Sequence, residues 1–255
     1  MRDPVPALDR ALTMLEAIAQ SRRGYSASEL SRRLALPRSS AYLILRTLER
    51  RGYVQKQPTG GRYRIGAQAL MLSRSAPAGT DLREHAVPTL TALAQQTGLT
   101  AELGVLARTD VVVIERVEST ASVRVVSWIG RRYGANSTAL GKALLAFLPP
   151  TEVNALLRQT RLPRPTERTI ATSAALAREL EHVRELGYAV ADEEDEPGVR
   201  SVAAPILDAR HHPLAAIAIS GTTWQVPSDR LPSIGAVVRE AAAQVGSGLI
   251  GSDQV

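Results

Sequence analysis

The order of local signals between Ser26 and Ile65 constrains the fold of this chain more than any other feature. Ser26-Ala27-Ser28-Glu29 has the form of a capping box, in which the Ser26 oxygen accepts the Glu29 amide while Glu29 reaches back. A short helix follows, and Pro37 suits the first turn of another helix that we expect to end at Gly52. The sequence therefore predicts two helices joined by a tight turn.

Two short strands and an earlier helix complete this pattern. Tyr53–Lys56 and Arg62–Ile65 flank the turn residues Pro58–Gly61, which is typical of a β-hairpin. Before the capping box, apolar residues recur at intervals of three and four between Leu8 and Ala19, as on one face of a helix. Helix, short helix, turn, helix and hairpin in this order indicate a winged helix-turn-helix, a DNA-binding module.

The charge of the chain is divided unevenly along its length. Residues 1–78 hold 14 of the 31 Lys and Arg and 5 of the 25 Asp and Glu, a net charge of +9, whereas residues 79–255 carry −3. A general arginine bias would not leave the second part acidic. The asymmetry therefore favours a nucleic-acid-binding module joined to a domain of another kind.

The third predicted helix presents the side chains that would meet DNA. Arg38, Tyr42 and Arg46 recur every four residues and share one face, opposite the apolar residues. An arginine in the major groove can contact guanine, and the hydroxyls of Ser39 and Ser40 can bind phosphate at the helix N-terminus. The alternative is an ordinary amphipathic helix with a solvated face; the neighbouring elements and the local charge favour DNA binding.

The hairpin adds further cationic side chains. Lys56, Arg62 and Arg64 could follow a phosphate backbone or enter a minor groove; equally, they could be solvated charges that keep strand edges from pairing. The predicted DNA-binding residues are Ser28, Arg38, Ser39, Ser40, Tyr42, Arg46 and Arg62.

Behind this module we expect a linker helix and a second domain. Pro77-Ala78-Gly79 would end the linker, so the predicted domains are 1–66, 67–79 and 80–255. The predicted strands of the second domain are Thr100–Ala107, Val111–Val117, Val123–Trp128, Tyr188–Asp192, Ser201–Leu207 and Leu214–Ser220. Helices are expected at 81–96, 136–147, 152–158, 172–186 and 229–249. About six strands with helices on them make an α+β chain with a mixed α/β second domain.

Several segments together resemble the IclR family of bacterial transcriptional regulators. In the first part they are Ala7-Leu8-Asp9-Arg10-Ala11-Leu12, Leu36-Pro37-Arg38-Ser39-Ser40, Arg51-Gly52-Tyr53-Val54 and Gly61-Arg62-Tyr63-Arg64-Ile65-Gly66. In the second part they are Thr138-Ala139-Leu140-Gly141-Lys142-Ala143, Gly187-Tyr188-Ala189, Gly198-Val199-Arg200-Ser201 and Ala218-Ile219-Ser220-Gly221. The similarity runs in register from about residue 6 to 250.

The resemblance implies a GAF-like second domain that binds a small-molecule effector, and a homodimer or homotetramer that binds double-stranded operator DNA. A two-fold pair of reading helices would need half-sites about one turn, ~10 base pairs, apart. Carried over residue by residue, the effector-binding positions are Trp128, Ala139, Leu140, Ala191, Asp192, Ser201, Ala218 and Ser220. Repression and activation both stay open.

Some positions depart from the family pattern. Ala191 stands where an aspartate is common, Ser201 where a cysteine is common, and Ala218 where a serine is common. The pocket has lost polar anchors suited to a small oxo-acid, and each unmade hydrogen bond would cost ~1–3 kcal/mol. We therefore expect a larger or more apolar effector, with an aromatic ring as one option if Trp128 faces the pocket. Leu43 replaces a common arginine, which leaves base readout there open.

An enzyme, such as a hydrolase with a nucleic-acid-binding appendage, is the competing class. The sequence has none of the usual nucleophile-elbow, zinc-protease, P-loop or dinucleotide-binding motifs, so we expect no enzyme and no cofactor. The acidic run Asp192–Glu196 resembles a cation site only in composition; a solvated loop is the better interpretation, and no metal is expected.

Composition bounds the remaining possibilities. Hydrophobic residues make up 44% of the chain, enough for a buried core, and the absence of cysteine excludes disulfides and thiolate chemistry. No apolar run approaches the ~18 residues of a membrane span, and the N-terminus lacks a signal-peptide core. A cytoplasmic protein without a membrane partner is expected.

Overall fold

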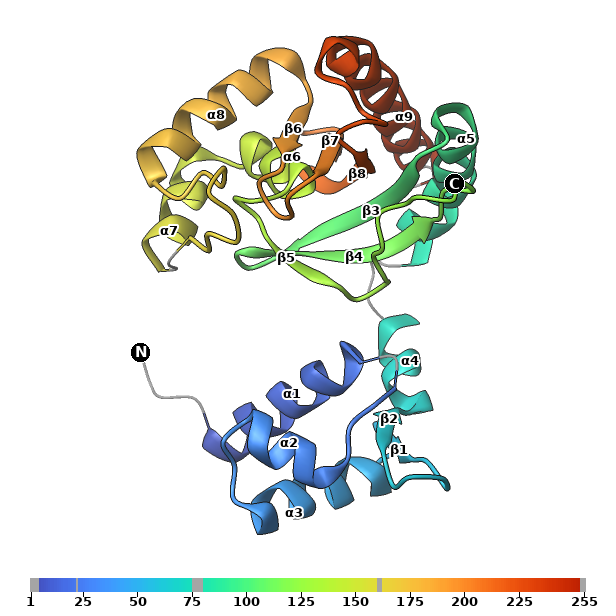
Figure 1. Ribbon diagram of the computed structural model, residues 1–255, viewed down its shortest axis with the longest axis vertical. Helices are drawn as coiled ribbons and strands as arrows, with labels where there is room; N and C mark the ends of the chain where they lie inside the picture. The colour runs from blue at the N-terminus through green and yellow to red at the C-terminus, as the bar shows by residue number, and fades with distance from the viewer. Residues whose placement is uncertain (1–4, 22, 75–79, 160–161, 253–255) are drawn as a thin grey trace. The chain divides into compact units, whose positions relative to one another are not determined.

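The computed structural model describes residues 5–21, 23–74, 80–159 and 162–252 (Figure 1). The chain divides into two compact units, Met1–Thr80 and Asp81–Val255. Each is described here by itself. Over the described residues, no helix is both long enough and apolar enough to cross a membrane.

The first unit is a winged helix-turn-helix, as the sequence predicts. Its elements are α1 Pro6–Ala19, α2 Ala27–Arg33, α3 Arg38–Arg50, β1 Val54–Lys56, β2 Tyr63–Ile65 and α4 Ala67–Arg74. β1 and β2 pair antiparallel, with Val54 opposite Ile65. Met14, Ile18 and Leu30 are buried with Leu45, so one small core joins the three helices. The last residues of the predicted linker, 75–79, lie outside the described residues.

The local signals explain where the helices of this unit begin and end. Both halves of the capping box form at α2: Ser26 Oγ accepts the Glu29 amide, and Glu29 accepts the Ser26 amide at 2.7 Å. Pro37 stands at the N-cap of α3, one residue before the predicted helical turn. Gly52 follows α3 with φ +75°, a left-handed conformation that glycine adopts without a steric cost. These termini set the angle at which α3 leaves the turn.

The second unit is built on one six-stranded antiparallel sheet, in the order β5-β4-β3-β8-β7-β6. Its strands are β3 Thr100–Ala107, β4 Asp110–Val117, β5 Arg132–Gly134, β6 Ala189–Asp192, β7 Val199–Leu207 and β8 Pro213–Thr222. Its helices are α5 Thr80–Thr97, α6 Ala139–Phe147, α7 Pro150–Gln159, α8 Ser173–Leu186 and α9 Leu231–Ser252, with a short 3₁₀ turn η1 at Ser228–Arg230. The α+β architecture with six strands agrees with the sequence prediction.

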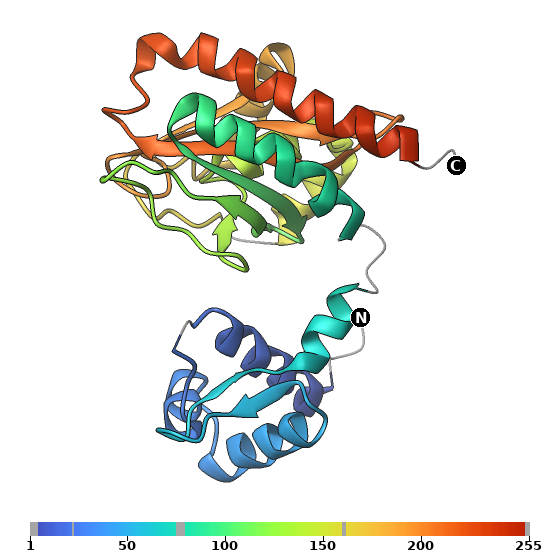
Figure 2. The same cartoon turned by 90° about the vertical axis from the view of Figure 1, so that its right-hand side faces the viewer.

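The two faces of the sheet carry side chains of different size. On β8, Ile217 and Ile219 point toward α5 and α9, which run side by side in Figure 2. The intervening Ala216 and Ala218 belong to the other core, with α6 and α8. Because successive side chains of a strand alternate between faces, Ala216 and Ala218 line the same side. Their small size lets α6 approach the sheet closely, which places the start of that helix at the candidate site.

One predicted strand is wrong. The segment from Val123 to Trp128 is irregular, and the edge strand beside β4 is Arg132–Gly134 instead. The β-branched run favoured a strand, yet Val123 and Val126 are more than half exposed. Arginine side chains donate hydrogen bonds to two backbone carbonyls of this segment. Arg131 donates to the Val126 carbonyl at 2.8 Å, and Arg116 donates to the Ser127 carbonyl. Backbone groups satisfied in this way do not need a neighbouring strand.

Candidate functional site

The exposed face of α3 gathers most of the predicted DNA-binding side chains. Arg38, Ser39, Tyr42 and Arg46 are exposed on this helix, and Ser40 is half-buried. The opposite face is packed into the core through Ala41, Leu45 and Leu48. Ser28 is exposed on α2, the other helix of the motif. The arrangement leaves a helix with hydroxyls in its first turn and two arginines along one solvent-facing side.

Arg62, which directly precedes β2, is bonded within its own unit. It donates to the Gly24 carbonyl at 2.8 Å and to Glu29 at 2.8 Å, and its side chain stays 39% exposed. Hydrogen bonds from Ser26 and the charge of Arg62 hold the pKa of Glu29 below its ordinary value. Arg62 therefore ties the hairpin to the capping box of α2, a role that the sequence did not indicate.

A small cavity in the second unit lies where β3, β7 and β8 meet the start of α6. Its volume is about 40 Å³, which is room for a few waters. Its lining is mixed, polar and apolar: Glu102, Val125, Tyr133, Thr138, Leu140, Asp195, Glu196, Val199, Ser201, Ala218 and Ser220.

The structure brings together four of the eight predicted effector positions. Leu140, Ser201, Ala218 and Ser220 line this cavity, and Ser201 stands opposite Ser220 in the register of β7 and β8. Ser220 is buried, whereas Ser201 is half-buried. The two hydroxyls therefore face the cavity from adjacent strands.

The other four predicted positions lie outside the lining. Ala139 and Ala191 are buried in the core between α6 and the sheet. Asp192 pairs with Arg168 at 2.9 Å and with Arg200 at 2.7 Å. The Trp128 ring lies beneath the Arg131 guanidinium, whose carbon is 4.8 Å from the ring centre and 4.5 Å from that of Tyr133. Only Tyr133 of these two rings lines the cavity.

Sequence reasoning did not place the four ionisable side chains of the cavity, Glu102, Tyr133, Asp195 and Glu196, at the effector site. Glu102 on β3 is 4% exposed, and Ser220 Oγ donates to its Oε2 at 3.4 Å. Burial raises the pKa of Glu102, an effect that nearby Ser127 and Arg116 partly offset. Burial likewise raises the pKa of Asp195, which accepts from Ser137 Oγ at 3.0 Å. Burial, reinforced by the Glu102 charge, also raises the pKa of the Tyr133 phenol.

The acidic run 192–196 is not the solvated loop that we expected. Glu194 is buried, and its Oε1 lies 2.7 Å from Nζ of Lys142, which is fully buried on α6. The same ammonium lies 2.8 Å from Glu179 Oε1 on α8. Burial raises the pKa of Glu194, while Lys142 opposes that rise. No signal in the sequence pairs residues that stand 52 positions apart. Over the described residues, no group of three His, Cys, Asp or Glu side chains is placed to hold a metal.

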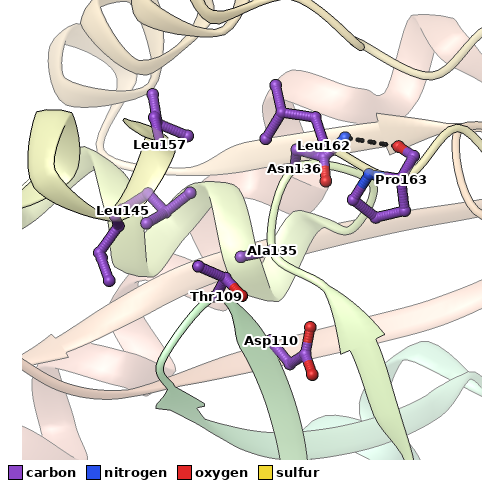
Figure 3. Close-up of a pocket in the computed structure, with 9 residues that line it drawn as sticks. Thr109, Asp110, Ala135, Asn136, Leu145, Leu157, Leu162 and Pro163 are labelled. Atoms are coloured by element: carbon purple, nitrogen blue, oxygen red, sulfur yellow. Dashed lines mark hydrogen bonds between the residues drawn. The ribbon is translucent and has the colours of Figure 1, made fainter. Parts of the chain in front are cut away.

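A second small cavity lies between α6, α7 and the 162–163 segment (Figure 3). It is lined mainly by leucines and a proline, with Thr109, Asp110 and Asn136 at its edge. Asn136 donates to the carbonyls of Pro163 and Ile170, both at 2.9 Å, and so fastens the 162–170 segment. None of the predicted effector positions lines this cavity, and its volume, measured in the same way, is about 30 Å³. We regard it as imperfect packing beneath α7.

Comparison with known proteins finds IclR domains in both parts of the chain. The helix-turn-helix domain of IclR matches residues 7–58, and the C-terminal domain of bacterial IclR transcriptional regulators matches residues 75–247. The HTH-type transcriptional regulator XynR of Escherichia coli strain K12 is 33% identical over 245 residues, which cover 96% of this chain and 96% of XynR.

Solved structures agree with the sequence relatives. The Thermotoga maritima IclR structure covers 96% of this chain and 99% of its own, with 30% identity and a TM-score of 0.71. An IclR homologue from Microbacterium hydrocarbonoxydans, solved in complex with 4-hydroxybenzoate, has a TM-score of 0.81 at 25% identity and covers 96% and 99%. These proteins are regulators, the class that the motifs favoured over an enzyme. The chain belongs to the IclR family of bacterial transcriptional regulators, which pair a helix-turn-helix DNA-binding domain with a C-terminal effector-binding domain.

Proposed function

We propose that this regulator binds operator DNA in the cytoplasm through the exposed face of α3. The observation that carries the proposal is that the two faces of this helix differ. Arg38, Tyr42 and Arg46 are exposed on one face, while the apolar residues of the opposite face are buried. Arg38 stands in the first turn, where the helix N-terminus would face the major groove, so it is the side chain proposed to contact a base. Ser28, Ser39 and Ser40 would bind DNA phosphates. The exposed part of Arg62 would contact the phosphate backbone of the DNA from the hairpin.

We infer that the chain acts as a homodimer or homotetramer. The first unit leaves large apolar side chains exposed on α1 and α4: Leu8 at 59%, Leu12 at 50%, Met71 at 59% and Leu72 at 54%. A second copy would cover such residues and place two reading helices on one duplex. The expected operator is a pseudo-palindrome with half-sites ~10 base pairs apart.

The cavity beside Ser201 and Ser220 is the proposed effector site. Its lining includes Val125, Leu140 and Val199, which supports an effector with an apolar body, with an aromatic ring as one option. An effector changes operator affinity only if it binds one arrangement of the assembly better than another. A tenfold change needs about 1.4 kcal/mol of that preference, which one or two contacts supply.

The test is an operator-binding titration of Arg38→Ala. The probes are the DNA upstream of the protein's own gene and a random duplex of equal length, and the readout is fluorescence anisotropy at fixed salt. Arg210→Ala, an exposed arginine in the turn between β7 and β8, is the matched control for the change in charge.

Loss of a bidentate base contact would cost about 1–3 kcal/mol on the operator and much less on random DNA. The Arg210→Ala variant should bind both probes like the wild type. Equal losses of affinity for the two probes would show that Arg38 contacts phosphate and would contradict the assigned base readout.

A further inference from the structure

The lining of the proposed effector cavity is rich in carboxyl groups. Glu102, Asp195 and Glu196 are among its eleven lining residues, and none of the eleven is Lys, Arg or His. An anionic ligand entering this cavity would meet carboxyl groups and would give up its own hydration. The lining therefore disfavours a carboxylic or oxo-acid effector.

Glu102 has a buried oxygen whose hydrogen-bonding capacity is not satisfied within the described residues. It is 4% exposed, and its Oε1 is buried without a hydrogen-bond partner among the described residues. The hydrogen bond that Ser220 donates to Oε2 is long, at 3.4 Å, and the Ser127 hydroxyl also lowers the pKa of this carboxyl group. A buried carboxylate oxygen left without a donor is costly in free energy. A ligand that donates a hydrogen bond to it would therefore be bound more tightly.

The nearby arginines do not donate to Oε1 of Glu102. Arg116 stands directly opposite Glu102 in the β3–β4 register; its Nη1 donates to the Ser127 carbonyl and lies 3.2 Å from Glu118, while its Nε is buried without a hydrogen-bond partner among the described residues. Arg131 donates to the Val126 carbonyl and lies over the ring of Tyr133. Both arginines lower the cost of the Glu102 charge, but neither forms a hydrogen bond with its Oε1.

We propose that the effector is a small amine: an ammonium group that donates to Glu102 and Asp195, on a compact apolar body lying against Val125, Leu140 and Val199. The inference rests on the proposed function of the cavity and assigns its ligand class. Charge-assisted hydrogen bonds to carboxylates are among the strongest that proteins make, and Ser201 and Ser220 remain available for a further polar group.

The experiment compares ligands that share one body and differ in the head group. Isobutylamine, isobutanol and isobutyrate are titrated calorimetrically into the full-length protein. The amine should bind at least about tenfold more tightly than the alcohol, and the acid should bind weakest. Tighter binding of the acid, or absence of binding by the amine, overturns the amine assignment.

Three variants separate the ligand class from the site. Glu102→Gln keeps the shape of the side chain and removes its charge, so it should weaken amine binding at least about tenfold while leaving alcohol binding nearly unchanged. Glu185→Gln, an exposed residue of α8, is the matched control and should bind like the wild type. Circular dichroism and thermal unfolding of each variant establish that it is folded.

Ser201→Leu fills the cavity and distinguishes the two possible failures. If it abolishes binding but the acid binds best in the wild type, the site stands and the amine class is wrong. If the amine binds the Ser201→Leu protein as tightly as the wild type, the cavity is not the effector site, and both the inference and the proposed function of the cavity fail.

Discussion

Replacing Lys142 by methionine tests the buried ion cluster of the second unit. The Lys142 side chain is 1% exposed, that of Glu194 10% and that of Glu179 26%. Methionine keeps an apolar stem of similar size, so the main effect is the loss of the ammonium group. Removing one partner of a buried ion pair costs ~3–5 kcal/mol, because the remaining charge stays buried.

The expected loss lies at the lower end of that range. Glu179 is a quarter exposed and regains part of its hydration, whereas Glu194 does not, so we expect about 3–4 kcal/mol at neutral pH. In a domain of this size, each kcal/mol of lost stability lowers the midpoint of thermal unfolding by roughly 2–4 °C. The expected loss therefore lowers the midpoint for the second unit by about 6–16 °C. Lys56→Met, at the other lysine of the chain, changes the same charge on an exposed strand and serves as the control.

The loss of stability should depend on pH in a defined direction. Burial already raises the pKa of Glu194 above its ordinary 4.5, and removing Lys142 raises it further. A carboxyl group with a raised pKa in the folded state binds more protons there than in the unfolded chain, so the stability of the variant falls as pH rises above 4.5. Urea unfolding should show a larger deficit at about pH 8 than at about pH 5.

The added substitution Glu194→Gln should restore much of the stability, since it removes the charge left behind. A loss below ~1 kcal/mol, or the same loss at both pH values, would refute the uncompensated-charge argument.

Two further substitutions test how the two units are held together internally. Gly141→Ala would place a Cβ 2.2 Å from the Ala135 carbonyl oxygen at the start of α6, so it should destabilise the second unit by about 1–3 kcal/mol or more in urea unfolding. Gly248→Ala, whose Cβ would lie at an ordinary contact distance of 3.4 Å from His85, is the helical control, and equal stability of the two variants would contradict the close packing at Gly141. Arg62→Ala removes the bonds to Gly24 and Glu29, so calorimetry should show the first unit unfolding at a lower temperature than in Arg64→Ala, an exposed neighbour without those bonds; identical midpoints would mean that Arg62 does not hold the hairpin.

Local signals predicted the first unit well, because its folding rules act over short distances. The capping box at Ser26 and the stop at Gly52 involve residues within a few positions of each other, and both are present in the structure. The helix that ends at Gly187 was predicted for the same reason. The alternation of apolar residues likewise located five of the six strands.

Long-range pairing explains what the sequence could not predict. Val123–Trp128 has the composition of a strand, but Arg116 and Arg131 satisfy its carbonyls, and no local pattern reveals that. The acidic character of the cavity was missed because Glu102 and Asp195 are 93 positions apart and meet only through the sheet. Residue-by-residue transfer placed Ser201 and Ser220 at the cavity, whereas Trp128 lies beside it rather than in its lining.

The two bonds of Arg62 have a consequence for the timing of recognition. They join the hairpin to α2 within the folded unit. The entropy of ordering this arm is therefore lost during folding, not during association. The position of the hairpin relative to α2 is therefore part of the folded unit, and operator binding would add only the ordering of the side chains that touch DNA.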